Sequence, residues 1–131
     1  MATAKKTARQ PDVQLIANTV ITDPRGRVLL TRYDDDDAER WWLPGAQLRP
    51  YEDPEAALQR ALDGLVTGTE RVVLHHVESF RGRRGWHVML NFRVKAKAGA
   101  ATADGTWFRA DALPPFAHGR WEPGVIGKAL A

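Results

Sequence analysis

The chain has 131 residues, 44% of them hydrophobic and 27% charged, and it contains no cysteine. This length suits one domain with its own core, and the missing cysteines exclude disulfides, thiolate metal sites and cysteine nucleophiles. No apolar run approaches the roughly 20 residues that a membrane-spanning helix needs, and the first residues lack the apolar core of a secretory signal. We therefore expect a cytoplasmic protein without a membrane partner.

Positive charge is concentrated in residues 1–11, which contain Lys5, Lys6 and Arg9 and no acid. The formal net charge of the whole chain is also +3, so the remaining residues balance 16 basic against 16 acidic side chains. A balanced domain lacks the electrostatic footprint of a nucleic-acid binder. The sequence thus predicts a disordered basic tail at 1–11 and a single domain at 12–131, and it argues against a nucleic-acid partner.

Runs of β-branched residues or of alternating polarity predict five strands, at residues 13–22, 27–33, 72–80, 86–94 and 106–109. Pro24 and Gly26 lie between the first two strands and predict a turn, so these strands should form a hairpin. Four consecutive aspartates follow at 34–37. Such a run can bind a cation, but adjacent like charges repel and we favour a solvated loop.

The clearest predicted helix begins at Asp53, which is a suitable N-cap. Pro54 suits the first helical position, and Glu55 favours the helix dipole in the first turn. Apolar side chains then recur at helical spacing, at Ala57, Leu58, Ala61, Leu62, Leu65 and Val66. Gly68 can end this helix in a left-handed conformation, and residues 122–130 predict a second helix. Strands around a long helix, with a helix at the end, make an α/β sandwich.

The run W-L-P-G-A at 42–46, followed by Glu52 and Arg60, resembles the signature of the Nudix hydrolase family. That signature is G-x(5)-E-x(7)-R-E-U-x-E-E-x-G-U, with U apolar, and W-x-L-P-G usually precedes it. Placing Ala46 at the signature glycine aligns Glu52 with the first glutamate, Arg60 with the arginine and Leu62 with the apolar position. The segments V-L-L-T-R-Y at 28–33 and T-W-F-R-A-D-A-L-P-P at 106–115 are also similar. The resemblance implies an α/β/α sandwich with a mixed sheet, one long helix after the W-L-P-G loop and a C-terminal helix.

The family's three further glutamates are replaced here by Ala61, Gly64 and Leu65. In the family these glutamates lie at i, i+3 and i+4, on one helical face, and hold Mg²⁺ or Mn²⁺. The metals bridge a diphosphate and activate the attacking water. A glycine within the helix should also weaken it by roughly 1 kcal/mol. Arg49 and Tyr51 replace the acid–glycine pair usual in the preceding loop, and an arginine facing the site opposes cation binding. We therefore expect no metal site and no Mg-dependent pyrophosphohydrolase activity.

Glu52 and Arg60 match the family. There the pair is thought to tie the loop to the helix and to orient catalytic groups. We favour a structural ion pair that preserves the loop–helix geometry over a catalytic role.

Other residues offer weaker routes to chemistry. Asp63 lies about 100° from the face of the replaced glutamates and should point to solvent. Adjacent residues of a strand point to opposite faces, so only His76 of the pair His75 and His76 should join Glu78. With His87 these two could form a metal site, but ordinary polar residues on a half-exposed sheet are the commoner explanation.

Residues near the end of the second strand are candidates for contact with a ligand. Aromatic faces stack on bases, and arginine pairs with phosphate. The predicted ligand-binding residues are Arg32, Tyr33, Trp42, Arg49 and Glu78, with Trp41 as an alternative to Trp42.

Three functions remain open. We favour a Nudix-like domain that binds a nucleotide-like ligand or a protein partner without a cofactor. The alternative is an active hydrolase of nucleoside diphosphate derivatives that uses Mg²⁺ on relocated ligands. The third is a non-hydrolytic enzyme or a structural module on the same fold. The family often forms dimers, so a homodimer is a further expectation.

Overall fold

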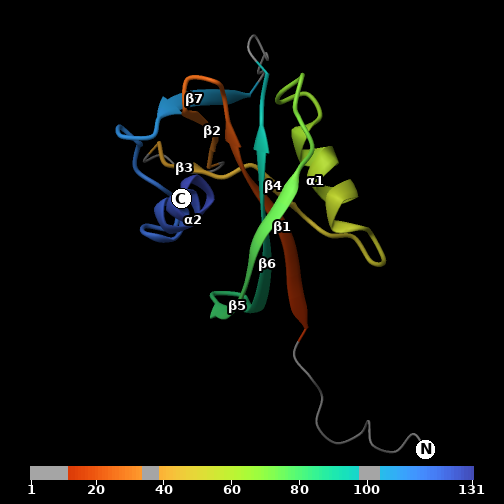
Figure 1. Ribbon diagram of the computed structural model, residues 1–131. Helices are drawn as coiled ribbons and strands as arrows, with labels where there is room; N and C mark the ends of the chain where they lie inside the picture. The colour runs from red at the N-terminus through yellow and green to blue at the C-terminus, as the bar shows by residue number, and fades with distance from the viewer. Residues whose placement is uncertain (1–11, 34–38, 98–103) are drawn as a thin grey trace, which may run out of the picture.

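The computed structural model describes residues 12–33, 39–97 and 104–131. The predicted basic tail and the aspartate run lie outside these residues. The described chain forms seven strands and two helices, with one helix on each face of the sheet (Figure 1). Their order is β1 (Val13–Thr22), β2 (Arg27–Arg32), β3 (Trp41–Trp42), β4 (Gly45–Gln47), α1 (Pro54–Leu62), β5 (Val73–Gly82), β6 (Gly85–Lys95), β7 (Gly105–Arg109) and α2 (Trp121–Leu130). None of the helices described is long and apolar enough to cross a membrane.

The sheet is mixed, and β1 lies near its centre. β1 runs parallel to β6 in one unbroken register from Val13 opposite Trp86 to Thr22 opposite Lys95, whereas the other pairs are antiparallel. The hairpin predicted between β1 and β2 is confirmed, but it is short. Only Thr22 and Val28 pair beyond the turn, after which β2 pairs with β7. This divergence separates β2 from β1, and β4 pairs with β1 further back along the strand.

The alternation of β1 divides the core between the two helices. Ala17 and Ile21 point to the face covered by α1 and belong to a cluster that contains Leu58. Val20 points to the opposite face and belongs to a cluster that contains Ile126 of α2. Glu122 at the start of α2 is fully buried, and both its carboxylate oxygens accept hydrogen bonds from His118. The predicted sandwich with a helix on each side is therefore confirmed.

Helix α1 begins as predicted but ends earlier. The Asp53 side chain accepts a hydrogen bond from the backbone N–H of Glu55, and Pro54 occupies the first turn. The helix stops at Leu62 because Asp63 is extended and Gly64 has a left-handed φ of 77°. The prediction that the helix continues towards Gly68, with Gly64 in its interior, is wrong. Leu65 and Val66 still reach the core, but through the turn that follows the helix.

Strand β4 was not predicted, because Pro44 and Gly45 indicate a stop. Gly45 pairs with Asn18 of β1, and the backbones approach closely. A Cβ on Gly45 would lie 2.5 Å from Asn18 Oδ1 and 2.6 Å from the backbone oxygen of Ala17. Glycine is therefore required here for steric reasons, and this contact brings the loop before α1 onto the sheet.

Candidate functional site

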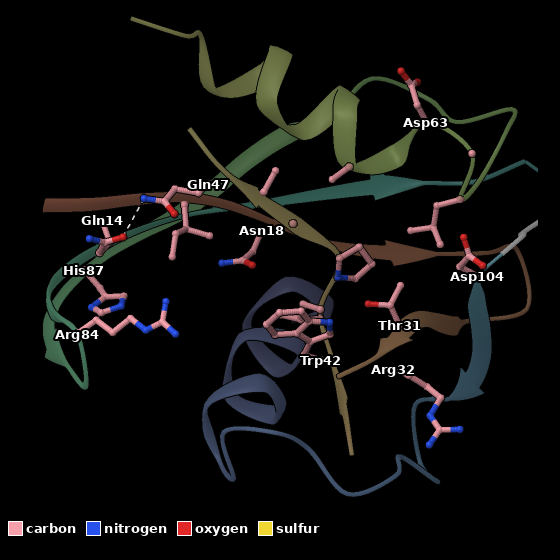
Figure 2. A pocket seen from close by; sticks show the side chains of 18 residues that line it. Gln14, Asn18, Thr31, Arg32, Trp42, Gln47, Asp63, Arg84, His87 and Asp104 are labelled. Carbon is pink, nitrogen blue, oxygen red and sulfur yellow. Dashed lines mark hydrogen bonds between the residues drawn. The ribbon is translucent and has the colours of Figure 1, made fainter. Parts of the chain in front are cut away.

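A cavity of about 860 Å³ lies on the face of β1 that carries Asn18, between β4, the end of α1 and the β5–β6 turn. Figure 2 shows its two ends and its middle. Asn18 and Trp42 lie in the middle. One end is formed by Gln14, Arg84 and His87, and the other by Thr31, Arg32 and Asp104. The volume is within the range of small-molecule sites in proteins.

Ala61, Gly64 and Leu65 all line this cavity. Although α1 ends before Gly64, the turn after it keeps the three positions at the same wall. None of them offers a side-chain oxygen, and Leu65 is only 6% exposed because it packs into the core on the α1 side. The residues at these positions therefore do not fit the hard, oxygen-binding metal ions that the family resemblance implies.

Asp63 lies beside this wall, but its carboxylate is turned outwards (Figure 2). It is exposed, and its Oδ1 accepts a hydrogen bond from Gln59 Nε2 at 3.0 Å. Its outward orientation agrees with the expectation from the sequence.

Glu52 and Arg60 form an ion pair that joins three segments. Arg60 donates to Glu52 Oε1 at 2.6 Å and to Oε2 at 2.9 Å, and the backbone N–H of Arg49 donates to Oε1 at 3.0 Å. Arg60 also donates to the backbone oxygen of Gln47 in β4. The hydrogen bond from Arg60 and that from the Arg49 backbone lower the pKa of Glu52 to about 2. Both carboxylate oxygens are thus engaged in fixing the loop between β4 and α1.

The five residues predicted to bind a ligand are not brought together. Arg32 and Trp42 line the cavity, whereas Tyr33, Arg49 and Glu78 lie outside its lining. Tyr33 supports Trp42 from the side, with edge-on rings whose centroids are 4.7 Å apart. The exposed Arg32 side chain lies 3.8 Å from the Glu39 carboxylate.

Asn18 was missed by the sequence analysis. Its side chain points into the cavity (Figure 2) and is 94% buried, since only 6% is exposed. Among the described residues, its Nδ2 has no hydrogen-bond partner. A buried donor without a partner is costly, so this atom marks a place where a ligand acceptor would be stabilised. The available signal was an amide in the middle of an otherwise apolar and β-branched strand.

Comparisons with known proteins establish the fold of this chain. No family model and no curated protein matches its sequence. Its structure is similar to MutT NUDIX hydrolase from Burkholderia pseudomallei, with 22% identity, a TM-score of 0.71 and coverage of 90% of this chain and 98% of that one. It is also similar to the NUDIX domain of Shewanella oneidensis NrtR, solved in complex with ADP ribose, with 17% identity and a TM-score of 0.70. That match covers 99% of this chain and 97% of the NrtR domain. A third similar structure is Ap4A hydrolase from C. elegans, with 15% identity, a TM-score of 0.70 and coverage of 91% of this chain and 97% of that one. The chain has the Nudix fold.

On the face of the Nudix sheet that carries Asn18 and is covered by α2, β5 and β6 of this chain hold a polar cluster that lies outside the cavity lining. His76 Nε2 lies 2.7 Å from Glu78 Oε1, and Trp121 of α2 donates to Glu78 Oε2 at 3.1 Å. A β-bulge between Leu74 and His76 turns the His75 ring onto the same side, so that the two imidazole centroids are 4.8 Å apart. The prediction that His75 and His76 point to opposite faces is wrong, because it assumed an unbroken strand.

His87 does not join this cluster. Its Nδ1 donates to the backbone oxygen of Gly85 at 2.9 Å, and its ring stacks on Phe80 at 5.6 Å. In the part of the chain that the structure describes, no three histidine or acidic side chains are arranged to hold a metal ion. Chemically, the Nudix-fold cavity offers amide donors, arginines and an aromatic face, which suit binding of a polar, anionic and partly aromatic ligand.

Proposed function

We propose that this chain binds a nucleoside diphosphate derivative in the cavity and does not hydrolyse it by the metal-dependent route. The observation that carries the proposal is the composition of one wall. The cavity is retained, but the positions aligned with the family's metal ligands hold Ala61, Gly64 and Leu65, and Leu65 is part of the core.

The rest of the lining supports a nucleotide-like ligand. Trp42 presents an aromatic ring on which a base can stack. Arg32 and Arg84 supply guanidinium groups suited to phosphate, and Asn18 supplies a buried donor that has no partner among the described residues. A Nudix domain solved in complex with ADP ribose shows that another protein of this fold holds such a molecule.

Glu52 does not supply the missing chemistry. A general base must be free to accept a proton from the attacking water. Both oxygens of Glu52 already accept hydrogen bonds, and its pKa of about 2 makes it a weak base. This supports a structural role for the Glu52–Arg60 pair.

An active hydrolase is the second candidate, because two carboxylates, Asp63 and Asp104, border the cavity at the end near Gly64. Rotation of Asp63 away from Gln59 would be needed before both could face one cation. The two functions differ in what they require, since only the hydrolase needs bound metal.

Calorimetric titration separates them. The protein is titrated with Mg²⁺ and Mn²⁺, each with and without ADP-ribose, and with ADP-ribose in EDTA. We expect ADP-ribose to bind in EDTA and neither metal to bind. Metal binding that ADP-ribose strengthens, together with release of AMP, would instead support the hydrolase.

A pair of tryptophan variants locates the binding site. Trp42→Leu should weaken ADP-ribose binding by about tenfold, as expected for the loss of a stacking interaction of roughly 1–3 kcal/mol. Trp86→Leu is the control, because Trp86 is partly exposed on β6 and lies outside the cavity lining. Equal affinities of the two variants would place the ligand elsewhere.

A further inference from the structure

The β5–β6 turn places one arginine in the cavity and its neighbour outside it. Gly82 and Gly85 pair across the turn, leaving Arg83 and Arg84 as its two central residues. Gly85 has a φ of 105°, which a residue with a side chain rarely adopts. Arg84 lines the cavity and points into it in Figure 2, whereas Arg83 is absent from the lining.

Among the described residues, the guanidinium of Arg84 has no acidic partner. Arg84 takes part in none of the ion pairs formed within residues 12–33, 39–97 and 104–131. At the other end of the cavity, Arg32 has the Glu39 carboxylate at 3.8 Å, and the carboxylate of Asp104 is part of the lining. Within the part of the chain that the structure describes, positive charge without an acidic partner is therefore found at the Arg84 end of the cavity.

His87 lies beside Arg84, and two contacts orient its ring. Phe80 stacks on the His87 ring with an interplanar angle of 4°, and Gly85 accepts the Nδ1 proton. A Cβ on Gly82 would lie 2.7 Å from Nδ1, so glycine is needed to let the ring approach. With Nδ1 committed as donor, Nε2 is the ring nitrogen left to meet a ligand.

Amide groups complete this end. Gln47 Nε2 donates to Gln14 Oε1 at 2.8 Å, and this bond uses neither Nε2 of Gln14 nor the side-chain oxygen Oε1 of Gln47. Asn18 lies four residues along β1 from Gln14, roughly 13 Å in an extended strand. Its side chain points into the same cavity, and its Nδ2 has no partner among the described residues.

We infer that the Arg84 end of the cavity binds the phosphate groups of a nucleoside diphosphate directly, without a metal ion. The inference rests on the proposed function and specifies it. In this arrangement the phosphate groups lie at the end of the cavity opposite the wall of Ala61, Gly64 and Leu65. There the charge of Arg84 takes the place of the metal charge. Asn18 donates to the part of the ligand between the two ends. The nucleoside then lies towards Trp42.

The test uses two adjacent arginines of one turn. Wild-type protein, Arg84→Gln and Arg83→Gln are titrated in EDTA with ADP, inorganic pyrophosphate and adenosine, at low and at moderate salt. Arg84→Gln should weaken ADP and pyrophosphate by about tenfold or more, since a hydrogen bond to a charged group contributes roughly 1.5–3 kcal/mol. Adenosine affinity should stay the same. Arg83→Gln should change each affinity less than twofold, and both variants should unfold at the wild-type temperature.

The outcomes are distinguishable. If wild-type protein binds ADP and the two variants lose affinity equally, the charge acts only at long range, and the inference is wrong while the proposed function stands. If Arg84→Gln weakens adenosine as much as ADP, the phosphates are not at Arg84. If wild-type protein binds neither ADP nor adenosine, the proposed function itself is wrong.

Discussion

Replacing Asn18 by leucine should make the protein more stable and less able to bind its ligand. The two side chains have similar size, so the change mainly removes the amide. In the ligand-free protein, Asn18 Nδ2 is buried without a partner among the described residues. Such a donor costs about 1–3 kcal/mol. Removing it should therefore raise the free energy of unfolding by about 1–2 kcal/mol, or the Tm by roughly 4–7 °C for a domain of this size. Affinity for ADP should fall by about five- to tenfold, the effect of one lost hydrogen bond of about 1 kcal/mol.

Thr19→Val is the matched control. Thr19 is 1% exposed, and its Oγ1 also lacks a partner among the described residues. It follows Asn18 in β1 and therefore points to the other face of the sheet. The valine variant should be stabilised in the same way, but its ADP affinity should not change. Urea unfolding and calorimetry on wild type and both variants measure the two effects separately.

Either of two results would contradict this role of Asn18. A loss of stability in Asn18→Leu would mean that the amide supports the fold, for instance by a hydrogen bond formed in solution. Unchanged ADP affinity, with stability raised, would mean that the orphan donor does not face the ligand.

Three other predictions concern the frame of the site. Gly64→Ala should destabilise the protein by about 1 kcal/mol in urea unfolding, because Gly64 has a φ of 77°. If Gly64 were helical, the same substitution would instead stabilise the protein by a similar amount. The Glu52 pKa of about 2 lies below the ordinary 4.5, so the ion pair contributes stability above pH 4.5 that is lost as the pH falls towards 2. Thermal unfolding of Glu52→Gln should accordingly depend less on pH across that interval than unfolding of wild type. Gly45→Ala should cost about 1–3 kcal/mol, the usual effect of overpacking, because its Cβ would meet the Ala17 backbone oxygen; chemical denaturation checks this, and an unchanged midpoint would contradict the close approach of β4.

The sequence predicted the elements whose signals are local. The bounds of β1 are those predicted, and β6 differs from its prediction by one residue at each end. In both strands, β-branched or alternating residues suffice to define the strand. The N-terminus of α1 was also predictable, because Asp53 and Pro54 act through neighbouring backbone groups.

The features that were missed depend on contacts between distant segments. The C-terminal end of α1 was misplaced because Leu65 and Val66 keep helical spacing in sequence although they are buried through a turn. The β4 pairing depends on the approach of Gly45 to β1, and the bulge at His75 depends on the register of β5 against β6. Neither leaves a periodic signal in its own segment.

The candidate site was only partly predictable for the same reason. Trp42 is the first residue of the W-L-P-G motif and Arg32 belongs to the V-L-L-T-R-Y segment, and both segments carry the family resemblance. Asn18, Arg84 and His87 come from strands and a turn that no motif marks, and they meet only because β1 and β6 are parallel neighbours. Parallel pairing places Gln14 opposite His87, and this register creates the end of the cavity.

The Glu52–Arg60 pair explains how a cavity of this kind can persist without carboxylates at the metal-binding positions. Arg60 links α1 to Glu52 in the loop and to the backbone of Gln47 in β4. We expect these intramolecular hydrogen bonds to position the wall of the cavity without a metal ion. Ligand binding should then be insensitive to EDTA at neutral pH, and should weaken in acid only when Glu52 becomes protonated and releases Arg60. A ligand affinity that required added Mg²⁺ at pH 7 would show that this frame alone does not form the binding site.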